Sequence, residues 1–277
     1  MIFRKRTIPD EEIMTLKEQR SMLGDQLNFA AAEAYKLLRA NLTFSLPDEQ
    51  KCRVVGVTSA VRGEGKSTTS INLAYTLAET GKHVLLVEAD MRRPQLAHRL
   101  AIDAAPGLSN LLAGLCREKD VVQDVGLLEN MKVITSGDVP PNPSELLGSE
   151  RMSTVVETLA QSFDFIIFDL PPVNAVSDGL VVSRFIQGMI VVVRQDYSDR
   201  QGLSAALRQL EYMHIKVLGF VMTHSSISGG RYGRYGRYGR YGRYGQYGRY
   251  ESESRETGAD QERARKTGSA KSRKSKR

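Results

Sequence analysis

Short apolar runs alternate with stretches of helical periodicity between about residue 50 and residue 225. The runs are rich in β-branched residues and have the length of buried strands in a parallel sheet. Strands that alternate with helices are typical of the α/β class, so the pattern predicts a doubly wound, mostly parallel sheet. The predicted strands cover residues 54–57, 83–88, 131–135, 163–170, 188–193 and 216–223.

Apolar residues recur at helical spacing between these runs and also before the first one. One predicted helix begins at Ser144, whose hydroxyl is expected to cap it, and buries Met152, Val155, Val156 and Leu159. The other predicted helices cover residues 28–44, 70–80, 107–115, 176–186 and 202–213.

A glycine-containing loop joins the first predicted strand to the helix that starts near residue 70. Strand, loop, Gly-Lys-Ser and helix together predict a P-loop, in which backbone N–H groups and the helix N-terminus bind phosphate. Ala60 stands where the usual spacing has its first glycine. The alternative is a chance Gly-Lys-Ser in a surface loop, which the flanking strand and helix disfavour. The predicted nucleotide-binding residues are Arg62, Gly63, Glu64, Gly65, Lys66, Ser67 and Thr68.

Acidic residues follow two of the other predicted strands. Glu88 and Asp90 come at the end of the strand 83–88, and Asp169 ends the strand 163–170. The carboxyl ends of strands carry the ligand site in open parallel sheets, so these acids are candidate site residues. Asp169 stands where nucleotide-binding folds have a carboxylate linked to the metal, usually through water. The alternative is that they only cap helices or form turns.

Charge divides the chain into parts. The formal net charge is +7, but residues 231–277 carry 15 Lys and Arg against 5 Asp and Glu, or +10, which leaves −3 for the rest. We therefore expect a mobile N-terminal segment (1–27), a P-loop domain (28–225) and a disordered Tyr/Arg/Gly-rich and basic tail (226–277).

The sequence shows no signal peptide and no apolar run that approaches the ~20 residues needed to span a bilayer. Its two cysteines are far apart in the sequence, so we expect a reduced, cytoplasmic chain.

The tail repeats Arg-Tyr-Gly with a period of three residues, which fits neither helix nor strand. Two interpretations remain from the residues alone. One is a nucleic-acid arm, in which arginine neutralises phosphate and tyrosine stacks on bases. The other is an array of phospho-acceptors, comprising Tyr232, Tyr235, Tyr238, Tyr241, Tyr244, Tyr247 and Tyr250.

Taken together, these motifs resemble the bacterial tyrosine kinase (BY-kinase) family over roughly residues 28–250. The matching segments are EAYKLLRANLTF, TSAVRGEGKSTTSINLA, VEADMRRP, SGDVPPNPSELL and FIIFDLPPV, followed by the tyrosine cluster. The resemblance implies that Lys66 contacts the β/γ-phosphates, that Ser67 binds magnesium and that Asp90 and Asp169 hold its shell. It makes position 88 the base that accepts the tyrosine proton, although this chain has Glu88 where the family has Asp. Either the local backbone compensates for the longer side chain, or Asp90 takes part of this catalytic role.

The resemblance also implies an oligomer and an activity. An interface motif on the helix 28–44 matches Glu33, Lys36 and Arg39, with Lys36 in place of an arginine. The implied activity is that of a non-specific protein-tyrosine kinase, which uses ATP and Mg²⁺ to autophosphorylate the tail in trans and regulates exopolysaccharide or capsule synthesis. The implied partners are a transmembrane polysaccharide co-polymerase that activates it, further copies of the chain and a cognate tyrosine phosphatase. Its place would be the inner face of the membrane, held there by the co-polymerase.

Two alternative functions belong to other classes. A nucleotide-switched, nucleic-acid-binding ATPase of the partition-ATPase type would use the Arg-Tyr tail as its arm. That class resembles this chain in fold but carries a second lysine where Val61 stands here, which favours the kinase and makes nucleic acid an unexpected partner. The other alternative is a scaffold that binds nucleotide without transfer, with Glu88 as the sign of lost chemistry.

Overall fold

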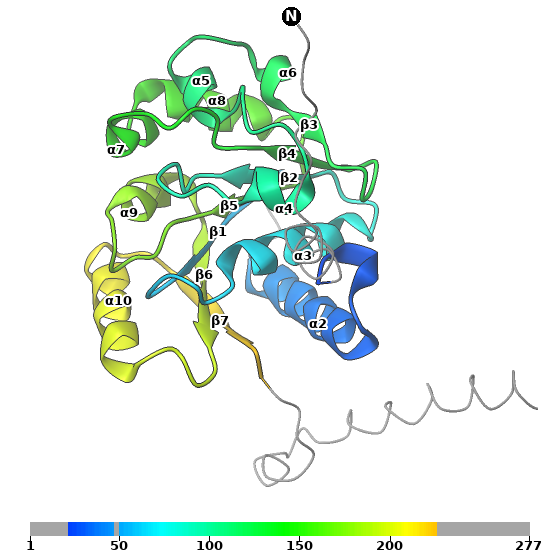
Figure 1. Cartoon of the computed structure of the whole chain (residues 1–277), viewed down its shortest axis with the longest axis vertical. Helices are drawn as coiled ribbons and strands as arrows, with labels where there is room; N and C mark the ends of the chain where they lie inside the picture. Colours follow the sequence, from blue (N-terminus) through cyan, green and yellow to red (C-terminus); the bar gives the residue numbers. More distant parts are fainter. Residues whose placement is uncertain (1–21, 47–49, 226–277) are drawn as a thin grey trace, which may run out of the picture. The chain divides into compact units, whose positions relative to one another are not determined.

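The computed structural model describes residues 22–46 and 50–225 as a seven-stranded sheet with helices on both faces (Figure 1). The strand order is β3-β4-β2-β5-β1-β6-β7, and every pairing is parallel except that of β3 with β4. The expected doubly wound, mostly parallel sheet of the P-loop type is therefore confirmed. The strands are β1 (Arg53–Ser59), β2 (Val84–Glu88), β3 (Gln123–Asp124), β4 (Met131–Ile134), β5 (Phe165–Asp169), β6 (Gly188–Arg194) and β7 (Val217–Thr223).

Two apolar clusters lie on opposite faces of the sheet, because alternate strand residues point to opposite sides. On one face, Val55, Leu86 and Ile167 pack with residues of α2, α3 and α4. On the other, Leu85 and Phe168 pack with residues of α5, α8 and α10. The helices are α2 (Phe29–Ser45), α3 (Lys66–Ala78), α4 (Leu96–Leu100), α5 (Leu108–Leu112), α6 (Glu118–Val121), α7 (Pro143–Leu147), α8 (Glu150–Leu159), α9 (Asp178–Val182) and α10 (Arg200–Tyr212), with 3₁₀ turns η1 (Gly24–Gln26) and η2 (Ser183–Phe185).

The segment that begins at Ser144 differs from the single helix expected there. It forms two helices, α7 and α8, and the cap of α8 is Ser149, whose side chain accepts a hydrogen bond from the backbone N–H of Met152. The Ser144 hydroxyl instead donates to Asp178. The expected buried side of the second helix is confirmed, since Met152, Val155, Val156 and Leu159 are all buried.

Residues 22–27 fall within the expected N-terminal segment, yet part of this stretch packs on the domain. Leu23 is buried, and the backbone N–H of Gly24 donates to Asn72 Oδ1 at 2.9 Å. The Asn72 side-chain amide in turn donates to the carbonyl of Met22 at 2.9 Å. Within the described residues, packing on the domain therefore includes residues that precede α2.

Residues 22–46 and 50–225 all belong to one compact unit, Met1–Ser225. In this described part of the chain, no helix has the length and apolar character needed to cross a bilayer. The tail tyrosines at positions 232–250 lie outside the described residues.

Candidate nucleotide site

The predicted P-loop and the predicted acids meet at the carboxyl edge of the central strands. β5 lies between β1 and β2. Asp169, the last residue of β5, is therefore level with Val57 of β1 on one side and with Glu88 of β2 on the other. The P-loop follows β1, and Asp90 lies two residues beyond the end of β2. This edge is where open α/β sheets bind their ligands.

The loop has the backbone that a phosphate cradle needs. Gly63 and Gly65 adopt left-handed φ values of +78° and +95°, which side chains with a Cβ rarely tolerate. A Cβ at Gly65 would also lie 3.1 Å from Thr223 Cγ2. Ala60 is buried and has no positive φ, which explains why this loop does not require glycine at that position.

The side chain of Glu64 points into the protein and not toward a ligand. It is completely buried, and its carboxylate accepts hydrogen bonds from the Val61 N–H at 2.8 Å and from the Ser198 hydroxyl. The Glu64 carbonyl accepts a further bond from the Thr223 hydroxyl at 2.7 Å. Glu64 therefore braces the loop through its side chain, and only its backbone is left to meet a phosphate.

Asp169 lies beside the start of α3, which begins at Lys66. Its carboxylate accepts hydrogen bonds from the hydroxyls of Ser67 and Ser70, the latter at 3.2 Å. Burial raises the pKa of Asp169, while the charge of Lys66 and the serine hydroxyls act to lower it. This serine-to-carboxylate contact fits the expected roles, in which Ser67 would bind Mg²⁺ directly and Asp169 would support it.

Asp90 is partly exposed and lies close to two cations of the P-loop. Its Oδ1 accepts the backbone N–H of Arg93 at 3.2 Å. Burial raises the pKa of Asp90, and the charges of Lys66 and Arg62 oppose that rise. Asp90 is therefore a carboxylate within the electrostatic reach of Lys66 that still has contact with solvent.

Glu88 occupies a very different environment. Its side chain is 1% exposed, and one oxygen accepts the backbone N–H groups of Gln95 and Leu96, the latter at 2.7 Å. The other oxygen accepts the N–H of Ser136 at 3.1 Å. Burial raises the pKa of Glu88 to about 7, although these three hydrogen bonds lower it. Both oxygens of the expected base are thus engaged by backbone.

The structure adds a buried network that the sequence patterns did not reveal. Asp178, at the start of α9, is completely buried and accepts two hydrogen bonds from the Arg92 guanidinium, at 2.7 and 3.2 Å. The Ser144 hydroxyl at the start of α7 also donates to it. Because these residues are 34 to 86 positions apart, no local signal connected them.

Arg99 of α4 is a second residue that sequence reasoning missed. Its Nη1 lies 3.3 Å from Thr68 Oγ1, in the first turn of α3. Its Nε is buried without a hydrogen-bond partner, and within the described residues the guanidinium forms no ion pair. A cation in this position suits an anionic ligand, so these residues fit a nucleotide phosphate.

The residues around Ser67 offer few ligands for Mg²⁺, so they suit a magnesium ion that is also bound by the phosphates of a nucleotide. Within the described ranges, no three His, Cys, Asp or Glu side chains gather into a ready-made metal site. Mg²⁺ commonly binds through one or two protein groups together with substrate phosphates and water. Ser67 and the nearby carboxylates match that sparse set.

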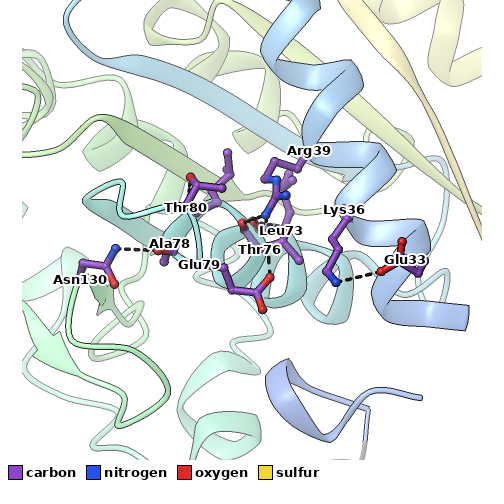
Figure 2. Close-up of polar contacts among 10 residues, drawn as sticks. Glu33, Lys36, Arg39, Leu73, Thr76, Ala78, Glu79, Thr80 and Asn130 are labelled. Carbon is purple, nitrogen blue, oxygen red and sulfur yellow. Dashed lines mark hydrogen bonds and ion pairs between the residues drawn. The ribbon is translucent and has the colours of Figure 1, made fainter. Parts of the chain in front are cut away.

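The three expected interface residues lie on α2, but they do not share one role (Figure 2). Lys36 and Glu33 pair with each other at 2.8 Å on the exposed surface. Arg39 points toward the end of α3, where its Nη1 donates to the Thr76 carbonyl at 2.5 Å and lies 3.8 Å from Glu79 Oε2. Arg39 therefore joins two helices of the same protomer.

Sequence comparisons show which known proteins this chain is similar to. A family model described as an AAA domain matches residues 52–218. Tyrosine-protein kinase YwqD of Bacillus subtilis is 34% identical over 197 residues, covering 71% of this chain and 82% of that protein. Tyrosine-protein kinase CpsD of Streptococcus pneumoniae serotype 4 is 35% identical over 203 residues, covering 73% and 88%. The chain spans only 27% of the longer tyrosine-protein kinase ptk of Acinetobacter johnsonii, at 33% identity.

Solved structures lead to the same family. The kinase domain of Escherichia coli tyrosine kinase ETK aligns with a TM-score of 0.68 and 30% identity, covering 81% of this chain and 85% of that one. The chimerical protein CapA2B2 aligns with a TM-score of 0.69 and 31% identity, covering 74% and 89%. The septum site-determining protein MinD of Pyrococcus horikoshii, at 24% identity and a TM-score of 0.52, shares the fold alone. With relatives above 30% identity over most of the P-loop domain, this chain belongs to the bacterial tyrosine kinase family.

Proposed function

We propose that this chain is a protein-tyrosine kinase that uses Mg-ATP and acts in exopolysaccharide or capsule synthesis. The observation that carries the proposal is the group formed by Lys66, Ser67, Asp90 and Asp169 at one sheet edge, in a chain whose relatives are named tyrosine-protein kinases. Phosphoryl transfer needs mainly positioning and charge neutralisation, and this group offers both.

The proposed roles follow from the environment of each side chain. When bound, Mg-ATP supplies the γ-phosphoryl group, which the tyrosine oxygen attacks. Lys66 would neutralise the negative charge of the β/γ-phosphates. The Ser67 hydroxyl would bind the metal, and Asp169 would orient that hydroxyl. Gly63 and Gly65 let the backbone N–H groups approach the phosphates.

The base is the point at which geometry favours a different residue from the family pattern. Both oxygens of Glu88 accept backbone N–H groups, and the residue is buried away from solvent. Asp90 is partly exposed and lies near Lys66. We propose that Asp90 accepts the tyrosine proton and that Glu88 is a positioning residue which holds α4 and Ser136 against the end of β2.

The proposed substrates include the seven tail tyrosines from Tyr232 to Tyr250, modified by another copy of the chain. A non-specific tyrosine preference, a transmembrane co-polymerase that activates the kinase, a cognate phosphatase and a place at the inner face of the membrane are parts of the same proposal. They rest on the family resemblance.

Phosphotyrosine mapping by mass spectrometry tests the proposal. The full chain is incubated with Mg-ATP beside a Lys66→Met variant. We expect modification of the tail cluster only where Lys66 is intact. If wild-type protein remains unmodified, also with a candidate activator's cytoplasmic segment present, the kinase proposal is wrong.

A further inference from the structure

A groove of about 430 Å³ lies between α5, α7 and the loop that follows β4. The lining residues that matter here are Asn110, Leu115, Asp138, Val139 and Glu145. None of them belongs to the P-loop or to the acidic residues of the nucleotide site. The groove is therefore a surface feature that the proposed chemistry does not use.

Hydrogen bonds to one side chain build the wall of this groove. Asn110 donates to Asp138 Oδ2 at 2.7 Å and accepts the N–H groups of Gly107 and Asp138 at 3.0 and 3.2 Å. A Cβ at Gly137 would lie 2.3 Å from Asn110 Oδ1, so the close approach requires glycine. Because the loop is already held in place, a ligand would not have to order it.

The groove combines exposed apolar surface with negative charge. Leu115 and Val139 are 76% and 65% exposed, and Pro140 and Pro141 lie beside them in the lining. Asp138 and Glu145 are its charged residues, and no Lys or Arg occurs among the described residues that line it. Such a surface suits a ligand that carries both aromatic rings and positive charge.

The groove lies next to the proposed reaction centre. Its loop follows β4, which pairs with β2, and neighbouring strands are about 5 Å apart. At the start of the loop, the Ser136 N–H donates to Glu88 at 3.1 Å, and Glu88 precedes Asp90 by two residues. A peptide held in the groove would thus pass close to the acidic end of β2.

We propose that this groove, defined by Leu115, Asp138, Val139 and Glu145, is the docking site for the Arg-Tyr-Gly repeat of a second copy of the chain. Residues 231–250 carry six arginines and no Asp or Glu, which complements the two acids. This inference rests on the proposed function and names how that site selects its substrate.

The repeat length suits docking of one tyrosine while another reacts. Three extended residues span roughly 10 Å, so successive tyrosines are about that far apart. The ring of one repeat tyrosine packs on Leu115 and the two prolines of the groove. The arginine that precedes this tyrosine pairs with Asp138 or Glu145, and a neighbouring tyrosine reaches the nucleotide. Phosphorylation adds about −1.5 to −2 charges per tyrosine, which the two acids repel, so modified repeats leave.

Steady-state kinetics with a synthetic peptide copying residues 230–241 test this docking. The enzyme is the full chain, as wild type, as Asp138→Asn/Glu145→Gln and as Glu145→Lys. We expect each variant to raise the KM for peptide about tenfold, with kcat at saturating peptide and the KM for ATP unchanged. The matched control, Glu129→Gln/Glu157→Gln, removes two exposed acids elsewhere and should leave all three values as in wild type.

The outcomes separate the two proposals. Equal peptide KM values in the groove variants and the control would overturn the docking site, as would a parallel rise in the KM for ATP. If wild type phosphorylates no peptide, also with the activator's cytoplasmic segment present, the proposed function is contradicted, and docking is decided by fluorescence anisotropy of the labelled peptide with the Lys66→Met chain. Binding that the groove variants lose, and that a peptide with arginine replaced by glutamine lacks, supports the groove. Equal binding by wild-type and groove-variant proteins refutes it.

Discussion

Glu88 shows how one side chain acquires a role from distant backbone. Glu88 is the last residue of β2. Its carboxylate accepts hydrogen bonds from backbone N–H groups at the start of α4 and in the loop after β4. An aspartate is one methylene shorter and would have to reach the same donors from further away. The longer side chain in this protein therefore suits the bracing role that the geometry indicates.

The first residue-scale prediction concerns pH and the Glu88→Gln variant. Burial raises the pKa of Glu88 to about 7 from an ordinary value of 4.5. The folded state therefore holds this proton more tightly, and the stability from Glu88 is complete below about pH 4.5 and falls as the pH rises to 7. The slope is at most about 1.4 kcal/mol per pH unit. Urea unfolding of nucleotide-free wild type and variant from pH 4.5 to 8 should show that the glutamine lacks this slope, and identical slopes would contradict the prediction.

The second concerns Arg99, whose guanidinium contacts Thr68 at 3.3 Å and has a buried Nε without partner. An anionic phosphate would satisfy it, so Arg99→Gln should weaken binding of ATP and of ADP by a similar factor of about 10. The melting temperature without nucleotide should change little, because the variant loses only one long hydrogen bond, to Thr68, and no ion pair. Calorimetric titration measures the affinities, with the exposed Arg117→Gln as control. A lowered melting temperature with unchanged affinities would show a structural role instead.

At the scale of elements, the buried Asp178 connects three segments near the site. Arg92 follows β2, Ser144 lies in the first turn of α7, and Asp178 begins α9. α7 and α9 place Leu147 and Val182 in the apolar cluster on this face of the sheet, and their N-terminal ends carry the polar contacts. Charged hydrogen bonds at their termini therefore set how α7 and α9 meet the loop after β2.

Removing this network should be costly. Asp178→Ala would leave the Arg92 and Ser144 donors without their acceptor, at a cost of about 2–3 kcal/mol in the free energy of unfolding. Asp124→Ala, which breaks the exposed pair with Lys132, is the matched control and should cost at most about 1 kcal/mol. Chemical denaturation of both variants provides the comparison, and equal losses would argue against the network.

At the scale of the whole molecule, α2 offers two kinds of residue to an assembly. Glu33 and Lys36 pair on the surface, whereas Arg39 reaches the C-terminus of α3 (Figure 2). A cation at a helix C-terminus donates hydrogen bonds to free carbonyls and interacts favourably with the negative end of the helix dipole. Arg39 thus contributes to the fold of the protomer whatever it does between protomers.

This difference yields a prediction for two alanine variants. Lys36→Ala should reduce the mass of the oligomer in solution while leaving the melting temperature within about 1 °C, since an exposed pair contributes little. Arg39→Ala should lower both, with a loss of about 1–2 kcal/mol in stability. Light scattering and thermal unfolding measure the two properties. An oligomer unchanged in both variants would remove α2 from the interface.

Sequence alone determined the sheet, most of its strands and the P-loop, because these depend on local signals. β-branched runs form buried strands wherever helices can cover them, and Gly63 and Gly65 meet a backbone requirement that no other residue fulfils well. Helix ends were less predictable: the break between α7 and α8 depends on a cap at Ser149 and on Ser144 being drawn to Asp178.

Tertiary structure alone decided what the polar side chains do. The sequence predicted Glu64 as a nucleotide-binding loop residue and Glu88 as the base, but the side chains of both are buried and accept backbone N–H groups. Arg99, which the sequence did not single out, reaches Thr68 from 31 positions away. The physical reason is that a buried charge takes its nearest available donors or acceptors, and those come from segments that only the folded sheet brings together.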